Sequence, residues 1–360
     1  MKPKIAIVHP LLKAGQIGGG ERVNLMIAEY FDADIFVVSA DTTWWNQQND
    51  DEFVRLFLRR VAGIGGEESH IPIVKKITRE QLMQKLGQSD FAQKLNQYDV
   101  VIFADDIRYL PQIITKPRTI FYRHTLLSTG LSGIFNNQTL AAMRACDIII
   151  SNSQYSALSL KSQFGSDSVV VFPPVDTSDC KNNGDAGYFL YAARLETHKG
   201  IRETVAFFTA HPQYHLKITG DGSQKAWLVH YLAQKKPANI EYLGVVDRAH
   251  YFELLSRCHA FVALYAHEAF GISPVEALAC GKPVLALSSG ALPEIIAHQK
   301  NGYIVQDRTE KNILDGVQWI DANYATIEAL NASQTTVFAP TRFFSQLSAL
   351  VQPPAQKLGE

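Results

Sequence analysis

The sequence predicts an α/β protein with two doubly wound, parallel-sheet domains. Short apolar runs rich in Val, Ile and Phe alternate with longer amphipathic segments, as expected for strands that helices bury on both faces. Residues 173–187, rich in Pro, Asp, Asn and Gly and without apolar periodicity, interrupt this alternation, which then restarts. A length of 360 residues also favours two domains over one.

The first half of the chain contains the strands of the first predicted sheet. A strand at 4–10, KIAIVHP, is followed by a predicted helix from about 20 to 31. The further strands are expected at ADIFVVSA (33–40), YDVVIFAD (98–105), PRTIFYRH (117–124), CDIIISNS (146–153) and VVVFPP (169–174). Continuous apolar runs of this kind are typical of buried parallel strands.

The second half repeats the pattern and contains the second predicted sheet. Its strands are expected at YFLYAARL (188–195), YHLKITGDG (214–222), NIEYLGVV (239–246), HAFVALY (259–265), KPVLALS (282–288) and GYIVQ (302–306). The segment PTRFFSQLSALVQ, near the end of the chain, has the pattern of an amphipathic helix. We place the first domain at 1–175 and the second at 176–339.

Charge and cysteine content restrict the class of protein. The net charge of −1 predicts no bulk attraction to nucleic acid or anionic lipid, so no nucleic-acid partner is expected. The cysteines Cys146, Cys180, Cys258 and Cys280 lie far apart and form no C-x-x-C pair, so we expect free thiols and no zinc site. The N-terminal apolar run is too short for a signal peptide, and no run reaches the roughly 18 apolar residues of a membrane span. We expect a cytoplasmic protein.

One amphipathic segment leaves two interpretations open. Residues 52–62, EFVRLFLRRVA, combine an apolar face with Arg55, Arg59 and Arg60. The pattern suits a helix on a membrane surface. A helix packed on the sheet is the simpler interpretation.

The stretch AHEAFGISPVEALACGKPV, at 266–284, has the pattern of a helix start. Ser273 suits the N-cap position, Pro274 the first helical position, and Glu276 the glutamate of a capping box. Gly271 allows a close approach of the backbone to a neighbour. On this interpretation Glu276 serves the helix alone.

The same stretch also predicts a binding site. It follows a strand, and ligands of doubly wound sheets bind outside the carboxyl ends of strands, where helix N-termini offer N–H groups. Glu268 and Glu276 bracket this position, and two carboxylates would repel a phosphate but accept hydrogen bonds from neighbouring hydroxyls. A ligand with both phosphates and diols is a nucleotide sugar.

These residues resemble a known family. EAFGISPVEALACGKPV is similar to the E-x7-E signature of retaining GT-B glycosyltransferases of family 4. Further similar segments follow the family's order, although Ala193 stands where the family usually has Gly. They are GGGER (18–22), YRHT (122–125), YAARLETHKG (191–200), ITGDG (218–222), LGVV (243–246), SGALPEII (289–296) and NGYIV (301–305).

The resemblance implies the GT-B fold and a division of labour between the domains. The first domain would be on the acceptor side, the second would bind the nucleotide sugar, and a helix at about 340–355 would pack back on the first domain. The domains would close over the donor and exclude water.

Arg194 and Lys199 match the pair that clamps the donor diphosphate in the family. Breaking the sugar–phosphate bond builds negative charge on the leaving diphosphate, which fixed cations stabilise. Without the resemblance, both side chains could equally be solvated surface charges.

The two glutamates match residues that contact the rest of the donor. The resemblance places Glu276 on the ribose hydroxyls and Glu268 on the sugar ring. Backbone N–H groups of Phe270, Gly271 and Ile272 would lie near the same ring. Glu276 could also cap the helix, a role that can coexist with ribose binding, and the alternative for Glu268 is a surface acid.

Other predicted site residues come from the remaining similar segments. Gly19 and Gly20 belong to a loop, with Gly18, that would approach the donor phosphates or the acceptor, or else form a tight strand–helix turn. His124 would line the cleft by the donor sugar, with its carbonyl helping to orient the acceptor, or else pack at a strand end. Gly220 and Gly222 would form a turn that faces the nucleotide. Glu294 would line the nucleotide pocket or cap its helix.

The implied activity is the transfer of a hexosyl unit, with retention, from a UDP- or GDP-sugar to a glycan or lipid-linked acceptor. The resemblance implies no metal and no cofactor, and a front-face mechanism in which the leaving phosphate takes the acceptor proton. Such an enzyme of polysaccharide biosynthesis could contact the inner membrane surface.

Three alternatives remain open at this point. Asp32 and Asp34 have the letters of an Asp-x-Asp manganese motif but precede a strand instead of following one. Asp41 lies where an NAD-dependent oxidoreductase would bind ribose, although the G-x-G-x-x-G fingerprint is missing. A non-catalytic subunit that binds a nucleotide sugar would have the same fold.

Overall fold

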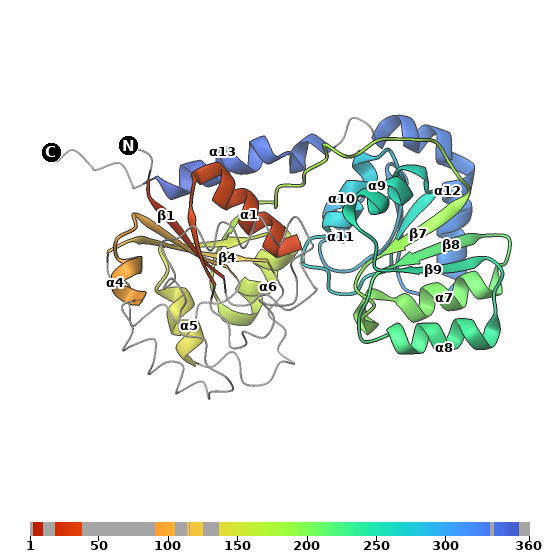
Figure 1. Ribbon diagram of the computed structural model, residues 1–360, viewed down its shortest axis with the longest axis horizontal. Coiled ribbons are helices and arrows are strands. Elements are labelled where there is room, and N and C mark those ends of the chain that lie inside the picture. The colour runs from red at the N-terminus through yellow and green to blue at the C-terminus, as the bar shows by residue number, and fades with distance from the viewer. Residues whose placement is uncertain are drawn as a thin grey trace. The chain divides into compact units, whose positions relative to one another are not determined.

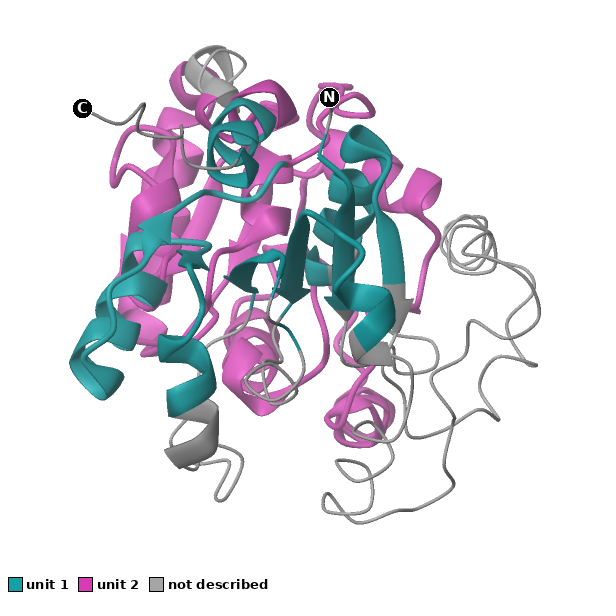
Figure 2. Cartoon of the chain, turned by 90° about the vertical axis from the view of Figure 1, so that its left-hand side faces the viewer, with its two compact units in different colours: residues 1–174, 343–360 teal, residues 175–342 magenta. Residues whose placement is uncertain are grey.

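The computed structural model describes residues 3–9, 19–37, 91–104, 114, 116–124, 137–331 and 335–352. The chain divides into two compact units, the first formed by 1–174 with 343–360 and the second by 175–342 (Figures 1 and 2). The segments 52–62 and Asp41, both singled out from the sequence, lie outside the described residues.

The first unit is built on a parallel sheet, as the apolar runs predicted. Within the described residues it has six strands in the order β2-β1-β3-β4-β5-β6. Ile7 of β1 pairs with Ile35 on one side and Ile102 on the other, and β3 is buried along its whole length. The strands are β1 (Ile5–His9), β2 (Asp34–Val37), β3 (Val100–Ala104), β4 (Arg118–Arg123), β5 (Ile148–Ser151) and β6 (Val169–Val170).

Described helices lie between β1 and β2, between β2 and β3, between β4 and β5, and between β5 and β6, as crossover connections of parallel strands commonly do. α1 follows β1, and α6 follows β5, with Ser153 as an N-cap that accepts a hydrogen bond from the Ser156 N–H. The helices with described residues are α1 (Gly19–Phe31), α4 (Phe91–Leu95), α5 (Asn137–Arg144) and α6 (Gln154–Phe164).

The last helix, α13 (Pro340–Val351), belongs to the first unit from residue 343 onward. Its apolar face is buried through Phe343, Phe344, Leu347 and Val351. Phe344 stacks on Tyr30 of α1 with ring centroids 4.0 Å apart. The amphipathic helix predicted from PTRFFSQLSALVQ therefore places aromatic side chains of its apolar face against α1 and against Tyr122 of β4, which lie far from it in the sequence.

The second unit contains another parallel sheet, with six strands in the described residues in the order β12-β11-β10-β7-β8-β9. The chain runs outward from β7 in one direction and from β10 in the other, so the switch point lies between these two strands. The strands are β7 (Tyr188–Ala192), β8 (His215–Thr219), β9 (Ile240–Gly244), β10 (Ala260–Ala263), β11 (Val284–Leu287) and β12 (Gly302–Val305).

The helices of the second unit flank this sheet (Figure 1). α10 follows β10, one of the two strands at the switch point. The helices are α7 (Ile201–Ala210), α8 (Lys225–Lys235), α9 (Arg248–Arg257), α10 (Ile272–Ala279), α11 (Leu292–Ile295) and α12 (Glu310–Asn331), with short 3-10 turns η1 (Thr197–Lys199) and η2 (Thr335–Phe338).

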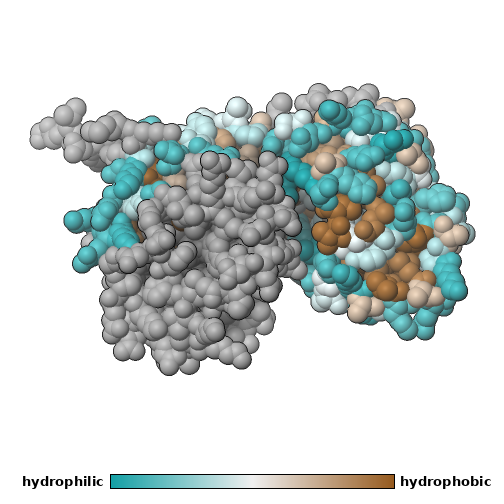
Figure 3. Space-filling model, in the orientation of Figure 1, coloured by the Kyte–Doolittle hydropathy of each residue, from teal (hydrophilic) through white to brown (hydrophobic). Residues whose placement is uncertain are grey.

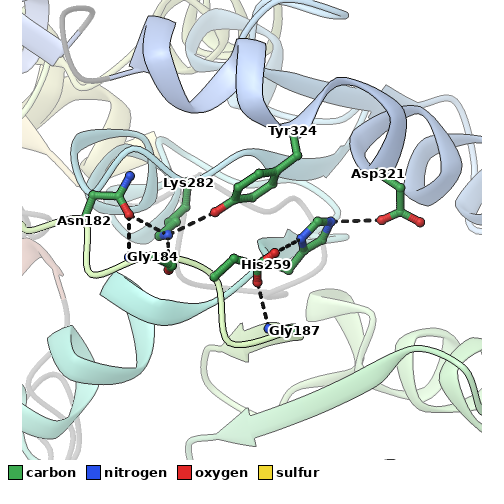
Figure 4. A network of polar contacts seen from close by, with 8 residues as sticks. Asn182, Gly184, Gly187, His259, Lys282, Asp321 and Tyr324 are labelled. Carbon is green, nitrogen blue, oxygen red and sulfur yellow. Dashed lines mark hydrogen bonds and ion pairs between the residues drawn. The ribbon is translucent and has the colours of Figure 1, made fainter.

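A buried lysine joins several segments at the amino ends of these strands (Figure 4). Lys282, which precedes β11, is fully buried, and its Nζ donates hydrogen bonds to Asn182 Oδ1 at 2.8 Å and to the Gly184 carbonyl at 2.7 Å. It also donates to the Tyr324 hydroxyl of α12 at 3.1 Å. The charge is thus compensated by fixed acceptors, as a buried ammonium requires.

A histidine forms a second set of contacts at the amino ends of these strands (Figure 4). His259, which precedes β10, lies between two carboxylates, with Nδ1 2.7 Å from Asp185 Oδ2 and Nε2 2.9 Å from Asp321 Oδ1. Its ring stacks on Tyr324 with centroids 4.6 Å apart. Burial lowers the pKa of His259, but the hydrogen bonds to Asp321 and Asp185 outweigh it and raise the pKa above its ordinary value.

The surface of the described residues is mixed. In Figure 3 the visible face of the second unit is largely hydrophilic, with smaller hydrophobic areas. The large apolar side chains that stay exposed come from different elements, and include Leu158 of α6 and Val245 after β9. In the part of the chain that the structure describes, no helix is both long enough and apolar enough to cross a membrane.

Candidate active site

The loops that leave β7 and β10 hold the predicted cations and the first glutamate. Arg194 follows β7 and is exposed, and Lys199 ends the turn η1. The Lys199 ammonium donates a hydrogen bond to Glu268 Oε2, and it lies 4.4 Å from the centre of the Tyr265 ring. The side chains of Lys199 and Glu268 are only 13% and 16% exposed, so their charges interact in partly water-excluded surroundings. Two residues distant in sequence thus meet at the switch point.

Arg308, which the sequence motifs do not include, holds these two loops together. Its Nε donates to the Leu264 carbonyl at 2.9 Å, and its Nη2 donates to the His198 carbonyl at 2.8 Å. The Ala266 N–H also donates to His198 O, at 2.7 Å. The backbone before Lys199 is therefore fixed to the backbone that leads to Glu268.

The pKa of His198 depends on the charged side chains nearby. Burial, and then the charges of Lys199 and Arg194, lower the pKa of His198 from its ordinary value, while Glu268 acts in the opposite direction. His198 is therefore mainly neutral near pH 7. The fixed positive charges of the loop after β7 are therefore those of Arg194 and Lys199.

Gly220 and Gly222 follow β8 and allow a close contact with the Arg194 loop. Gly220 has φ 131°, and a Cβ there would lie 2.0 Å from the Ala193 carbonyl oxygen. The Leu195 N–H donates to the Asp221 carbonyl at 2.8 Å. Close packing against the loop that bears Arg194 thus explains why glycine is needed at both positions. Their contact with a nucleotide stays a prediction.

The start of α10 differs from the sequence prediction. The helix begins at Ile272 with Gly271 as its N-cap, whereas Ser273 and Pro274 lie inside the first turn. Gly271 has φ 111°, which glycine adopts without strain, so the turn into the helix comes two residues earlier. The capping-box interpretation of Glu276 is therefore wrong, because Glu276 is the fifth residue of the helix.

The backbone that precedes α10 is firmly packed. Phe270 is buried and its ring lies edge-on to Phe338 at 5.5 Å, so this side chain serves the interior. The Ala291 N–H donates to the Glu268 carbonyl at 2.8 Å, and the His267 N–H donates to Ser289 Oγ at 3.0 Å. A site role for Phe270, Gly271 and Ile272 would rest on the backbone N–H groups at this helix N-terminus.

Glu276 is buried within the second unit and has partners on α9. Its residue is 6% exposed, the Tyr251 hydroxyl donates to Oε2 at 2.8 Å, and Arg248 Nη1 lies 3.6 Å from Oε1. No sequence motif pointed to Tyr251 or Arg248. Their contact with Glu276 depends on how α9 and α10 pack, which periodicity does not specify.

Glu294 lies in the first turn of the short helix α11, and its N–H donates to the Ala291 carbonyl at 2.9 Å. The N-cap is Ala291, so Glu294 is not the capping residue. Its carboxylate is at the positive end of the helix, where negative charge is favoured. A place in a nucleotide pocket stays a prediction.

In the first unit, His124 follows β4 and joins three elements. Its Nε2 lies 3.0 Å from Oδ1 of the buried Asn24 on α1, and its carbonyl accepts a hydrogen bond from Asn152 Nδ2 at 2.8 Å. Gly19 and Gly20 form the first turn of α1, not a loop, and a Cβ on Gly20 would lie 3.0 Å from the Cβ of His124. The structure thus gives His124 a packing role and brings it beside Gly20, while its contact with substrate stays a prediction.

The described residues show no cluster of three or more His, Cys, Asp or Glu side chains that could hold a metal ion. All four cysteines are free thiols. Asp34, part of the Asp-x-Asp sequence, instead accepts a hydrogen bond from the Tyr98 hydroxyl at the start of β2.

The comparison with protein families decides the class of the second unit. Residues 177–333 match the model described as glycosyl transferases group 1. The second unit of this chain thus matches the group 1 glycosyltransferases. The resemblance read from EAFGISPVEALACGKPV is thereby confirmed, and the matched segment includes Arg194, Lys199, Glu268 and Glu276.

Similar proteins extend this result. An uncharacterised glycosyltransferase of Methanocaldococcus jannaschii is 24% identical over 171 residues, which is 48% of this chain and 48% of that protein. A glycogen synthase of Mycobacterium tuberculosis is 30% identical over 118 residues, 31% of this chain and 28% of that protein. The chain thus matches less than half of the length of either relative.

A solved structure supports the fold of the whole chain. The crystal structure of Anabaena HepE in complex with UDP and glucose is similar with a TM-score of 0.73 and 20% identity, over 97% of this chain and 99% of HepE. The predicted GT-B fold is confirmed.

Proposed function

We propose that this group 1 glycosyltransferase moves a hexosyl unit from a UDP- or GDP-sugar to a glycan or lipid-linked acceptor, with retention and without a metal ion. The observation that carries the proposal is the meeting of Lys199 with Glu268 at the switch point of the second sheet, with Arg194 on the same loop as Lys199. This position is where doubly wound sheets bind their ligands.

The chemistry of the two loops suits a sugar diphosphate. Arg194 and Lys199 would stabilise the charge that develops on the leaving diphosphate, as a metal ion does in other transferases. In the free protein Lys199 is held by Glu268. A bound donor would offer the diphosphate to Lys199 and sugar hydroxyls to Glu268, so both groups would exchange one partner for another without leaving a charge unpaired.

Retention would follow from attack on the same face that the diphosphate leaves. The transition state would resemble an oxocarbenium ion, as in glycoside hydrolysis. A leaving phosphate oxygen would take the proton of the acceptor hydroxyl, so no side chain of this site has to act as a base. Arg194 and Lys199 would then stabilise the departing group as the sugar–oxygen bond breaks.

UDP-glucose is the first donor to test. HepE, which shares the fold, has been crystallised with UDP-glucose at 21% identity to this chain, a level that supports the fold and only suggests a ligand to try. We place the reaction in the cytoplasm. A lipid-linked acceptor would bring the protein to the inner membrane surface.

Thermal unfolding with candidate donors tests the proposal. UDP- and GDP-sugars are titrated with EDTA present, with NAD as the control ligand. A donor at about 100 times its dissociation constant adds about 2.7 kcal/mol to the apparent stability, which raises Tm by several degrees. A shift that EDTA leaves unchanged supports the metal-independent transferase. A shift with NAD alone, or with sugar nucleotides only when Mn²⁺ is added, contradicts it.

A further inference from the structure

Two side chains of α9 lie against the carboxylate of Glu276. The Tyr251 hydroxyl donates to Oε2 at 2.8 Å, and Arg248 Nη1 lies 3.6 Å from Oε1. One carboxylate oxygen is therefore directionally hydrogen-bonded, and the other faces a positive charge. Neither residue belongs to any motif that identified the family.

Tyr251 is a permanent donor. Burial of its hydroxyl, and then the charge of Glu276, raise the pKa of Tyr251 well above its ordinary value. The hydroxyl thus keeps its proton at neutral pH. The hydrogen bond to Glu276 is charge-assisted, which makes it stronger and more directional than one between neutral groups.

Arg248 is itself held in place from two directions. Its Nε donates to Asp179 Oδ2 at 3.1 Å, and its guanidinium lies 4.5 Å from the centre of the Phe252 ring. Its side chain is 33% exposed, against 8% for Glu276. Arg248 therefore supplies a fixed charge at the more exposed side of the buried carboxylate.

We propose that Tyr251 and Arg248 are positioning residues, which orient the Glu276 carboxylate so that it accepts hydrogen bonds from both ribose hydroxyls of the donor nucleotide. The inference rests on the proposed function. A carboxylate has about four acceptor positions, and Tyr251 occupies one of them on Oε2. Its hydrogen bond fixes the rotation of the carboxylate plane, which recognition of a neighbouring diol requires.

The test measures discrimination between ribose and deoxyribose. Dissociation constants are determined for UDP and GDP and for their 2′-deoxy forms, with wild type, Tyr251→Phe and Tyr188→Phe. The wild type is expected to bind the ribose form more tightly. Tyr251→Phe should reduce the ratio of the two constants about fivefold, which corresponds to the loss of one hydrogen bond.

Tyr188→Phe is the matched control. Tyr188 is a buried tyrosine of the same unit, and its hydroxyl donates to the Leu254 carbonyl of α9 at 2.7 Å. Its removal costs a similar hydrogen bond away from Glu276. The ribose-to-deoxyribose ratio should stay at the wild-type value, although Tm falls.

The outcomes separate this inference from the proposed function. If no nucleoside diphosphate binds the wild type, both are overturned. If the wild type binds nucleotides but Tyr251→Phe keeps the full ratio, or if the wild type shows no discrimination, the positioning role alone is overturned. Should Tyr251→Phe fail to fold, Arg248→Gln takes its place, because Arg248 is partly exposed. A folded Arg248→Gln with an unchanged ratio then contradicts the proposal.

Discussion

The two ends of the strands in the second sheet, here called the amino edge and the carboxyl edge, use charged side chains in opposite ways. At the amino edge, Lys282 is fully buried and donates to Asn182, Gly184 and Tyr324, all fixed acceptors (Figure 4). At the carboxyl edge, Arg194 is exposed, and Lys199 meets Glu268 in a pair that, under the proposed function, the donor separates. The same sheet thus has one edge where charged side chains are held by fixed partners and another that we propose binds the donor.

Strand direction explains the difference. At the amino edge, the segment 182–187 and the helix α12 supply acceptors that compensate each buried charge. At the carboxyl edge, β7 and β10 diverge at the switch point, and their loops hold Arg194, Lys199 and Glu268 around the place where ligands bind in such sheets. On this view, a charged side chain with a complete set of fixed partners stabilises the fold, and one whose partner can be exchanged for a ligand serves binding.

The largest expected effect is on activity at the carboxyl edge. Arg194→Ala should lower kcat/KM for the donor by about 100-fold, because it removes a cation that, under the proposed function, stabilises the leaving diphosphate. Initial rates over a range of donor concentrations measure the effect. Arg202→Ala is the control, since Arg202 on α7 donates to Gln224 Oε1 at 2.7 Å instead, and it should keep wild-type activity. Normal turnover of Arg194→Ala would contradict the site.

The next effect is on stability at the amino edge. Lys282→Met should lower the free energy of unfolding by about 2–3 kcal/mol, because it removes the three hydrogen bonds that the fully buried Lys282 ammonium donates to Asn182, Gly184 and Tyr324. Chemical denaturation measures this, and the activity of the folded fraction should be unchanged. Lys311→Met, on an exposed lysine of α12 that pairs with Asp315, should leave stability as it is. A selective loss of donor binding in Lys282→Met would remove the distinction between the edges.

The smallest effect is a pH dependence. Since the folded pKa of His259 is raised above 6.5, its contribution to stability is fully present below pH 6.5 and is lost as the pH rises through the folded pKa. The contribution should be about 1 kcal/mol or less, because Asp321 is 40% exposed and solvent screens the pair. Comparing Tm of wild type and His259→Gln across this range measures it. A difference that does not shrink as the pH rises would contradict the assigned charge.

The fold was readable from the sequence because parallel strands buried on both faces leave continuous apolar runs. Every predicted run became a strand, from Ile5–His9 to Gly302–Val305. Glu268 and Glu276 were also readable, since their spacing belongs to a family signature. The capping assignment of Ser273 failed for a local reason, because Gly271 adopts a positive φ and starts the helix earlier.

The hydrogen-bond partners of the candidate site residues could not be predicted from the sequence. Arg308 reaches the His198 carbonyl across 110 positions of sequence, and Tyr251 reaches Glu276 across 25. Such contacts depend on how helices pack beside the sheet, and single-sequence periodicity reports only which face of each helix is apolar. In the sequence, Tyr251 looks like any residue of an amphipathic helix, and Arg308 like any charged residue of a loop.

Hydrogen–deuterium exchange with and without UDP or GDP tests the contrast between the edges most directly. The nucleotide that raises Tm is used at saturation, and amide protection is followed along the second unit. Protection should increase at 193–200 and 266–276, where the loops after β7 and β10 lie, and stay unchanged at 182–187 and 281–283. Protection at the amino-edge segments instead, or none in the loops after β7 and β10 while the nucleotide is bound, would contradict the account.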